Sequence, residues 1–196
     1  KRGNIYRDHL TNGQPPVLVF DYEMILDGRD FERPVNYALV RIIDRRREST
    51  SGGKGSTADR RHQTQIATEA PEATSRPIVI FDPRAGHGPG IGGSKKDSQI
   101  GMALSQGHPV YFVLFTPDPV PGQTMADVQE TLARFLEKVA ELHPNARRPA
   151  IIGNCQAGWA VAMLGALHPD KVGPVILSGA PLSFWAGVAG KNPMRY

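Results

Sequence analysis

The chain has little cysteine, since Cys155 is the only one among its 196 residues. A single thiol excludes an internal disulfide framework, and it argues against a structural zinc site. No cluster of His, Cys and Asp has the spacing of metal ligands, so we predict no metal site. One free cysteine also suits a reducing compartment, and we expect a cytoplasmic protein.

Long hydrophobic runs are missing as well. No apolar stretch approaches the about 20 residues that a membrane-spanning helix needs, and no signal-peptide pattern opens the sequence. We therefore expect no membrane span. The sequence begins at Lys1 without a methionine and ends at Tyr196 soon after an apolar segment, so we interpret it as a fragment.

The net charge of +4 comes from one segment, because residues 41–62 hold seven basic and three acidic residues. This segment is rich in Ser, Thr and Gly and has no apolar periodicity, which is typical of a solvated linker. No aromatic residues alternate with its charges, so we predict no nucleic-acid partner. We expect two strands in residues 1–43, a flexible basic linker over 44–76 and a core domain over 77–196.

Strand and helix patterns alternate along the core. Apolar, β-branched and aromatic runs predict strands at Pro16–Phe20, Tyr37–Ile43, 77–82, 110–115, 150–153 and 175–178. Helices are predicted from a cap at Asp97 to Gln106, from Thr124 to about Leu142, and over 156–167. This order predicts right-handed crossovers and an α/β fold with an open, doubly wound, mostly parallel sheet.

In such sheets, ligands bind beyond the carboxyl ends of the strands. The glycine-rich loop 86–93, Asp118, Cys155 and Ser178 all follow predicted strands, so we expect them at one edge. The loop matches the G-x-G-x-x-G pattern of dinucleotide sites. Its first pattern glycine, Gly88, comes too late after the strand for the tight turn that such sites need, which leaves dinucleotide binding a minor alternative.

Cys155 lies in the segment Ile151–Gly158, where an apolar strand leads into a turn and a helix. The turn has small residues, Gly153 and Ala157, two positions before and after the cysteine, followed by Gly158. A strained nucleophile turn requires this lack of bulk. The start of the helix points its positive dipole end at the sulfur and favours the thiolate. Because a lone cysteine is often only a buried apolar residue, a structural role is the alternative.

Four longer stretches of the sequence resemble known proteins. They are Phe81–Gly93, His108–Val113, Gly153–Gln156 and Arg33–Leu39. Residues 77–185 resemble the central part of an α/β-hydrolase, and these strings are similar to an uncharacterised bacterial family labelled poly(3-hydroxyalkanoate) synthase-like. The elbow of those synthases reads Gly-x-Cys-x-Gly, from which Ala157 departs mildly. The resemblance implies a synthase-like architecture more than it implies polymerisation.

By analogy with the α/β-hydrolases, we assign the oxyanion hole to the backbone amide of Gln156 and to one amide at Arg84 or Ala85. In the hydrolase order, the acid and the histidine follow the nucleophile. His168 and Asp170 follow Cys155, but a helix over 156–167 carries them to the far side of the sheet. The base and acid are therefore expected beyond residue 196.

Other residues are candidates for the pocket. They are His87 in the glycine-rich loop, Asp118 after the strand at 110–115, and Trp185 after the last strand. We expect His87 to shape the pocket or touch the substrate, with a role as general base as the alternative. Asp118 lies between two prolines and is also typical of a turn, and Trp185 is also typical of packing.

A thiol nucleophile forms a thioester acyl-enzyme, which readily transfers its acyl group to an alcohol. We therefore hypothesise an acyltransferase of the poly(3-hydroxyalkanoate) synthase type. It would act on a small acyl substrate such as a 3-hydroxyacyl coenzyme A and need no cofactor. A cysteine-dependent ester or thioester hydrolase, and a non-catalytic relative that binds a partner or a granule surface, are the alternatives. The oligomeric state is left open.

Overall fold

The computed structural model describes residues 18–45, 74–83, 92–93, 95–116, 118–183 and 190–191. These residues form the strands β1 (Tyr22–Asp27), β2 (Tyr37–Ile42), β3 (Ile78–Phe81), β4 (Val110–Phe115), β5 (Ala150–Asn154) and β6 (Val175–Ser178). The helices among them are η1 (Gly28–Asp30, a short 3-10 helix), α3 (Gln99–Ser105), α4 (Met125–Leu142) and α5 (Ala157–Leu167).

The strands form one mixed sheet in the order β1-β2-β4-β3-β5-β6. The four strands β4, β3, β5 and β6 are parallel, whereas β2 runs antiparallel to both β1 and β4. Within the parallel part, Phe81 pairs with Gly153, and Asn154 pairs with Ser178. The ends of β3, β5 and β6 therefore meet at the same edge of the sheet.

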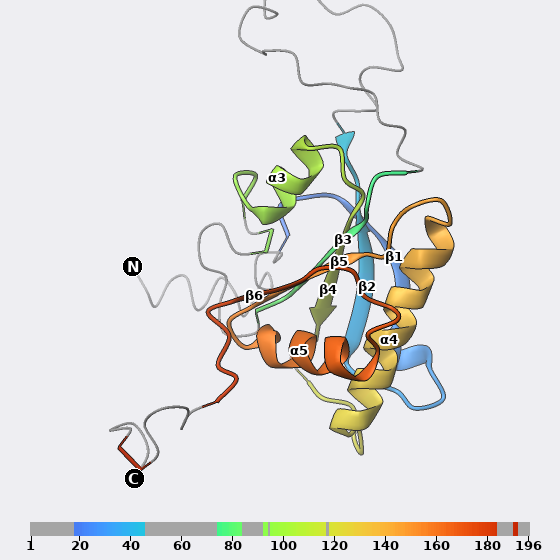
Figure 1. The fold of residues 1–196 in the computed structure, drawn as a ribbon. Helices are drawn as coiled ribbons and strands as arrows, with labels where there is room; N and C mark the ends of the chain where they lie inside the picture. The colour runs from blue at the N-terminus through green and yellow to red at the C-terminus, as the bar shows by residue number, and fades with distance from the viewer. Residues whose placement is uncertain are drawn as a thin grey trace, which may run out of the picture.

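Helices cover both faces of this sheet (Figure 1). On one face, α4 and α5 pack against alternate strand residues such as Val79, Tyr111 and Ile151. On the other face, α3 packs against the intervening residues, among them Ile80 and Phe112. Fully burying one such side chain stabilises the fold by about 1.5–3 kcal/mol. The predicted doubly wound, mostly parallel α/β sheet with two N-terminal strands is confirmed.

Most predicted elements lie where the sequence placed them. The strands at 110–115 and 175–178 are confirmed with the same bounds, and the others in the core agree within a residue or two. The helix predicted from Thr124 is α4, and Thr124 caps it, because its hydroxyl accepts from the amide of Asp127 and the Asp127 carboxylate accepts from the Thr124 amide. This reciprocal capping box satisfies donors that the helix would otherwise leave unpaired.

Two predictions near the ends of elements are wrong. Residues 18–20 of the predicted strand Pro16–Phe20 are not in a strand, and β1 begins at Tyr22 instead. The first half of β1 is exposed at the edge of the sheet, so pairing with β2 rather than apolar alternation defines it. The cap of α3 is Ser98 rather than Asp97, since the Ser98 hydroxyl accepts from the Gly101 amide.

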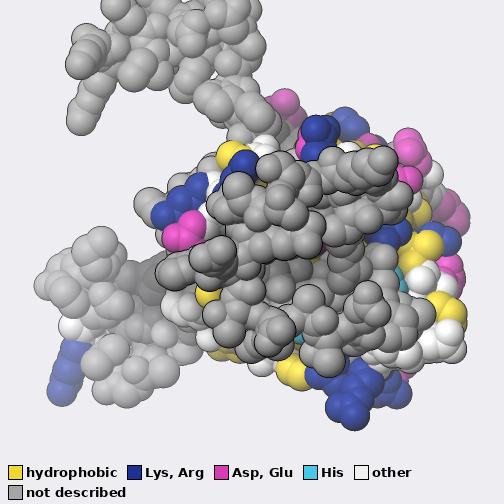
Figure 2. All heavy atoms as spheres, turned by 90° about the horizontal axis from the view of Figure 1, so that it is seen from above, with side chains coloured by type: hydrophobic (Ala, Val, Ile, Leu, Met, Phe, Trp, Pro, Cys, Tyr) yellow, Lys and Arg dark blue, Asp and Glu magenta, His cyan; other side chains and the backbone are white. Residues whose placement is uncertain are grey.

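Residues 46–73 of the predicted basic linker lie outside the described residues, so the linker stays a prediction. On the face seen in Figure 2, the described Lys and Arg side chains lie near described Asp and Glu side chains. None of the helices in the described ranges is both long enough and apolar enough to cross a membrane.

Candidate active site

Cys155 occupies the turn between β5 and α5, at the carboxyl edge of the parallel strands. Its φ angle is +49°, and it is the only described residue other than glycine with a positive φ. Left-handed backbone costs an L-residue roughly 1–2 kcal/mol, so the surrounding contacts must hold it. This is the geometry of a nucleophile elbow, which exposes the side chain above the sheet.

Two backbone hydrogen bonds hold the strained turn. The amide of Cys155 donates to the carbonyl of Ser178 at the end of β6 over 2.9 Å. The amide of Gly158 donates to the carbonyl of Cys155 over 3.0 Å. The side chain of Cys155 is half-buried and its thiol is free. The elbow is therefore attached to the neighbouring strand and to the first turn of α5.

The small residues around Cys155 let the strand and helix approach closely. A β-carbon added at Gly153 would lie 2.9 Å from both the α-carbon of Gly158 and the β-carbon of Val161. A β-carbon added at Gly158 would overlap the side chain of Ala180, which follows β6. Ala157 is buried at the first position of α5. Of the two elbow glycines, the tighter position is thus Gly158, one residue beyond the small-x-Cys-x-small pattern.

The predicted oxyanion hole is only partly described. Gln156 is exposed directly after Cys155, and among the described residues its backbone amide donates to no acceptor. An unengaged amide beside the thiol fits the assigned role of a donor to an oxyanion. Arg84 and Ala85 lie outside the described residues, so the second donor stays a prediction.

The candidate pocket residues are not assembled by the described contacts. His87 and Trp185 lie outside the described residues. Asp118 is exposed in the segment after β4, where its carbonyl accepts from the Thr116 hydroxyl at 3.5 Å. This contact belongs to the turn and gives Asp118 no link to Cys155.

His168 and Asp170 lie at the end of α5 remote from the elbow. His168 follows the last residue of α5, and its amide donates to the carbonyl of Leu164. The 11 residues of α5 span about 16 Å, which is too far for a proton transfer from Cys155. Asp170 is exposed beside Lys171. As the sequence predicted, neither residue is placed to serve Cys155.

Three polar residues near the elbow were not singled out from the sequence. The side chains of Asn154 and Gln99 exchange two hydrogen bonds, although 55 residues separate them. Asp82 is buried directly after β3, opposite Asn154 in the extended register. Asn154 is the residue before Cys155, but nothing local in the sequence indicates its partner.

No group of three or more His, Cys, Asp or Glu side chains that could hold a metal ion occurs in the part of the chain that the structure describes. The described polar groups at this edge thus include a thiol, a neighbouring backbone amide, the carboxamide pair of Asn154 and Gln99, and the buried carboxyl group of Asp82.

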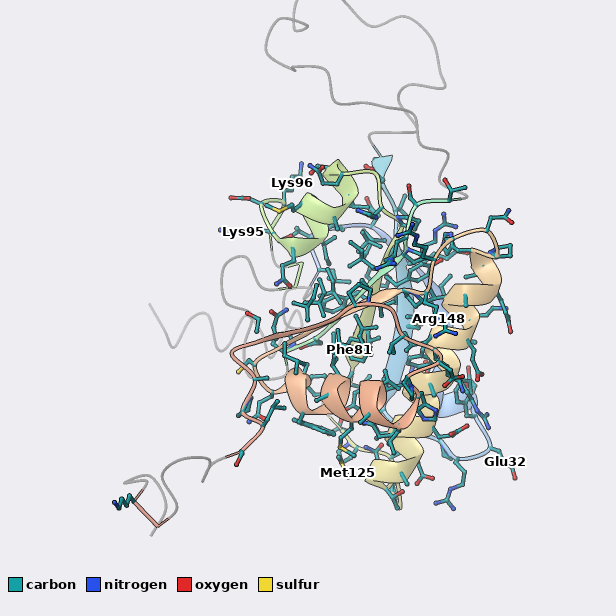
Figure 3. All side chains as sticks on the ribbon, in the orientation of Figure 1. Glu32, Phe81, Lys95, Lys96, Met125 and Arg148 are labelled. Atoms are coloured by element: carbon teal, nitrogen blue, oxygen red, sulfur yellow. The ribbon has the colours of Figure 1, made fainter. Side chains whose placement is uncertain are left out.

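The mixed six-stranded sheet, the helices on both faces and the strand–turn–helix at Cys155 are those of a partial α/β-hydrolase core. Phe81, the last residue of β3, lies in the middle of this core (Figure 3). The strand order thus brings the ends of β3 and β6 to either side of the cysteine turn.

Comparison with known sequences gives a family match over the whole chain. Residues 1–196 match the family described as "Protein of unknown function (DUF3141)". The uncharacterized protein in the ackA 5' region of Rhizobium meliloti is 48% identical over 197 residues, which covers 100% of this chain and 24% of that protein. The chain thus spans about a quarter of the length of that curated relative.

Solved structures with a similar arrangement include a predicted CIB-like hydrolase from Thermoplasma acidophilum, with 16% identity, a TM-score of 0.43, and coverage of 83% of this chain and 64% of that one. Esterase B from Lactobacillus rhamnosis has 13% identity and a TM-score of 0.41, with coverage of 90% and 52%. Because these similarities are low, the assignment of the fold depends on the strand order and the elbow.

Proposed function

The chain belongs to the DUF3141 family, whose function is unknown, and we propose that it supplies the nucleophile of a cysteine-dependent acyl transfer. The observation that carries this proposal is the positive φ of Cys155 between a parallel strand and a helix. A cysteine that served only as a small apolar side chain would need no strained backbone, since ordinary strand and helix geometry also buries it.

The proposed first step is acyl transfer from a thioester to the protein. The sulfur of Cys155 attacks the acyl carbonyl, and the amide of Gln156 donates to the developing oxyanion. The bond between the acyl carbon and the donor's sulfur then breaks, and the acyl group stays bonded to Cys155. The donor leaves as a thiol with the proton that Cys155 gave up. One oxyanion donor of this kind contributes about 3 kcal/mol to transition-state stabilisation.

The proposed second step transfers the acyl group to an alcohol. The alcohol oxygen attacks the thioester carbonyl, an ester forms, and the thiol of Cys155 is regenerated with the alcohol's proton. A 3-hydroxyacyl group carries such an alcohol itself, so repeated transfer would give a polyester, as the poly(3-hydroxyalkanoate) synthase resemblance implies. We assign the general base to no described residue, because His168 is at the remote end of α5.

Intact-mass spectrometry of the chain with a 3-hydroxyacyl coenzyme A tests this function. We expect a covalent acyl adduct that forms faster on the folded chain than on the urea-unfolded chain, since the elbow presents the thiol. Because Cys155 is the only cysteine, a thioester adduct has a single possible site. The Cys155→Ala variant is the control and should acquire no adduct.

Three results would count against the proposal. They are an adduct on Cys155→Ala, no adduct on the wild type from any acyl thioester, or equal rates for folded and unfolded chains. Product analysis then separates transfer from hydrolysis. Ester oligomers support the proposed transferase, whereas free 3-hydroxy acid as the only product replaces it with a thiol hydrolase.

A further inference from the structure

A pair of carboxamides connects the nucleophile turn to α3. The Asn154 side-chain nitrogen donates to the Gln99 side-chain oxygen over 2.7 Å. The Gln99 side-chain nitrogen donates back to the Asn154 oxygen over 3.1 Å. Asn154 is the residue before Cys155, and its side chain is buried, with 3% exposed. Each amide thus satisfies one donor and one acceptor of the other in a setting where unpaired groups are costly.

The amide pair and α5 contact opposite faces of the carboxyl end of β5. Side chains alternate along β5, so Gly153 faces α5, where it approaches Gly158 and Val161. Asn154 points to the other face, on which α3 packs and Gln99 is the first helical residue. The residue that follows, Cys155, is therefore anchored from both sides of the sheet.

Hydrogen bonds position the turn at Cys155 more precisely than apolar contacts would. Apolar packing tolerates small shifts, whereas two hydrogen bonds between planar amides define both distance and orientation. Cys155 has a strained backbone, so it relaxes unless its neighbours are held. The backbone hydrogen bond from Cys155 to Ser178 attaches the turn to the neighbouring strand β6. The amide pair attaches it to α3 on one face of the sheet.

We propose that Gln99 is a positioning residue for Cys155, which acts through Asn154 and does not itself touch the reacting atoms. This role rests on the proposed function of Cys155 as a nucleophile. Loss of the amide pair would let the turn relax toward ordinary backbone geometry and withdraw the thiol. A displacement of about 1 Å in a catalytic group can lower a rate by up to about a hundredfold.

The test measures how fast iodoacetamide alkylates Cys155, which requires no acyl substrate. We expect Gln99→Leu to alkylate about tenfold more slowly than the wild type in the folded state. The matched control is Gln106→Leu at the exposed end of the same helix, which should react at the wild-type rate. All urea-unfolded variants should react equally, because only the folded turn differs among them.

A second variant separates positioning from general stability. The exchange Gln99→Asn with Asn154→Gln keeps two amides and their summed length, so it should restore most of the alkylation rate. If Gln99→Leu does not fold, Gln99→Glu takes its place, since a carboxylate accepts from Asn154 but cannot donate to its oxygen. Hydrogen exchange at the Cys155 amide should quicken in parallel with the loss of alkylation.

The positioning role is overturned if a folded Gln99 variant alkylates at the wild-type rate. It is also overturned if the exchanged pair regains wild-type stability but not the alkylation rate. Failure of the proposed function gives a different pattern, because a chain that never forms an acyl adduct can still show slow alkylation in Gln99→Leu and recovery in the exchanged pair.

Discussion

Cys155 combines a strained backbone with a half-buried thiol, and the strained backbone depends on its neighbours. The carbonyl of Ser178 accepts from its amide, and Gly158 donates to its carbonyl. Asn154 is held on one face of the sheet while Gly153 contacts α5 on the other. The fold thus stores free energy at this residue, because the surrounding contacts hold its backbone at a positive φ.

The strain at Cys155 predicts that glycine at this position gives a more stable protein than alanine does. Glycine adopts positive φ without steric cost, whereas alanine keeps the strain. We expect Cys155→Gly to exceed Cys155→Ala by about 1 kcal/mol in the free energy of unfolding, measured with urea. Ala157→Gly at the start of α5 is the control and should lower stability by about 1 kcal/mol. A Cys155→Gly variant no more stable than Cys155→Ala would contradict the strained geometry.

The close approach at Gly158 predicts a loss of stability on adding one methyl group. Gly158→Ala should cost about 1–3 kcal/mol, because the new β-carbon overlaps Ala180. Gly165→Ala in the same helix is the comparison, since its β-carbon would meet only the Val175 side chain at 3.2 Å. Val175 is 40% exposed and can move aside, so thermal unfolding should show a much smaller loss. Equal losses would mean that the elbow contact is not tight.

At the scale of elements, two glutamines near the start of α4 differ in whether their side chains are hydrogen-bonded. Gln123 accepts from the amides of Asn36 and Val120, and it donates to the Asn36 side chain. Gln129 is 3% exposed, yet among the residues that the structure describes neither polar atom of its side chain has a hydrogen-bond partner. An unpaired buried polar group costs about 1–3 kcal/mol, so one glutamine supports the element and the other weakens it.

The same substitution at these two positions should act in opposite directions. We expect Gln129→Leu to raise the free energy of unfolding by about 1 kcal/mol, because it removes unpaired polar atoms. Gln123→Leu should lower it by about 1–3 kcal/mol, since it leaves the Asn36 and Val120 amides without an acceptor. Urea unfolding of both variants checks this. Destabilisation by Gln129→Leu comparable with that of Gln123→Leu would disprove the contrast.

Predictability from sequence differs between kinds of element. The strand at 110–115 and the helix predicted from Thr124 were correct within a residue, because apolar runs and helix-starting residues act within a few positions of each other. The first strand was misplaced because Tyr22–Asp27 is an exposed edge that exists through its pairing with β2. Similarly, Ser98 and Asp97 are both acceptable caps, and in the structure the Ser98 hydroxyl is the one that accepts from the Gly101 amide.

At the scale of the whole molecule, an ion pair joins the N-terminal strands to the parallel core. Arg33 donates to both carboxylate oxygens of Asp127 at 2.9 and 3.0 Å, across 94 residues of sequence. The Arg33 guanidinium, together with hydrogen bonds from Thr124, holds the pKa of Asp127 well below its usual range. The carboxylate is thus favoured in its charged form by the fold itself.

This lowered pKa predicts a stability contribution that depends on pH. Its full value is present above the ordinary carboxylate pKa of about 4, and it is lost as the pH falls toward the lowered value. Arg33→Gln should therefore be less stable than the wild type at neutral pH, and the difference should shrink in acid. Lys138→Gln is the control, because it removes only an exposed pair with Glu141 within α4. A difference for Arg33→Gln that persists unchanged in strong acid would contradict the assignment.

Local patterns in the sequence determined the alternation of strands and helices and the position of the turn at Cys155 between β5 and α5. These patterns suffice because backbone propensity, apolar periodicity and the demand for small residues act over one or two turns. The tertiary structure alone decided that Cys155 takes a positive φ, that Asn154 meets Gln99 and that Gly158 lies against Ala180. Such contacts depend on how the crossover connections bring segments that are distant in the sequence next to one another. The free energy that holds the strained cysteine comes from the packing of those segments together.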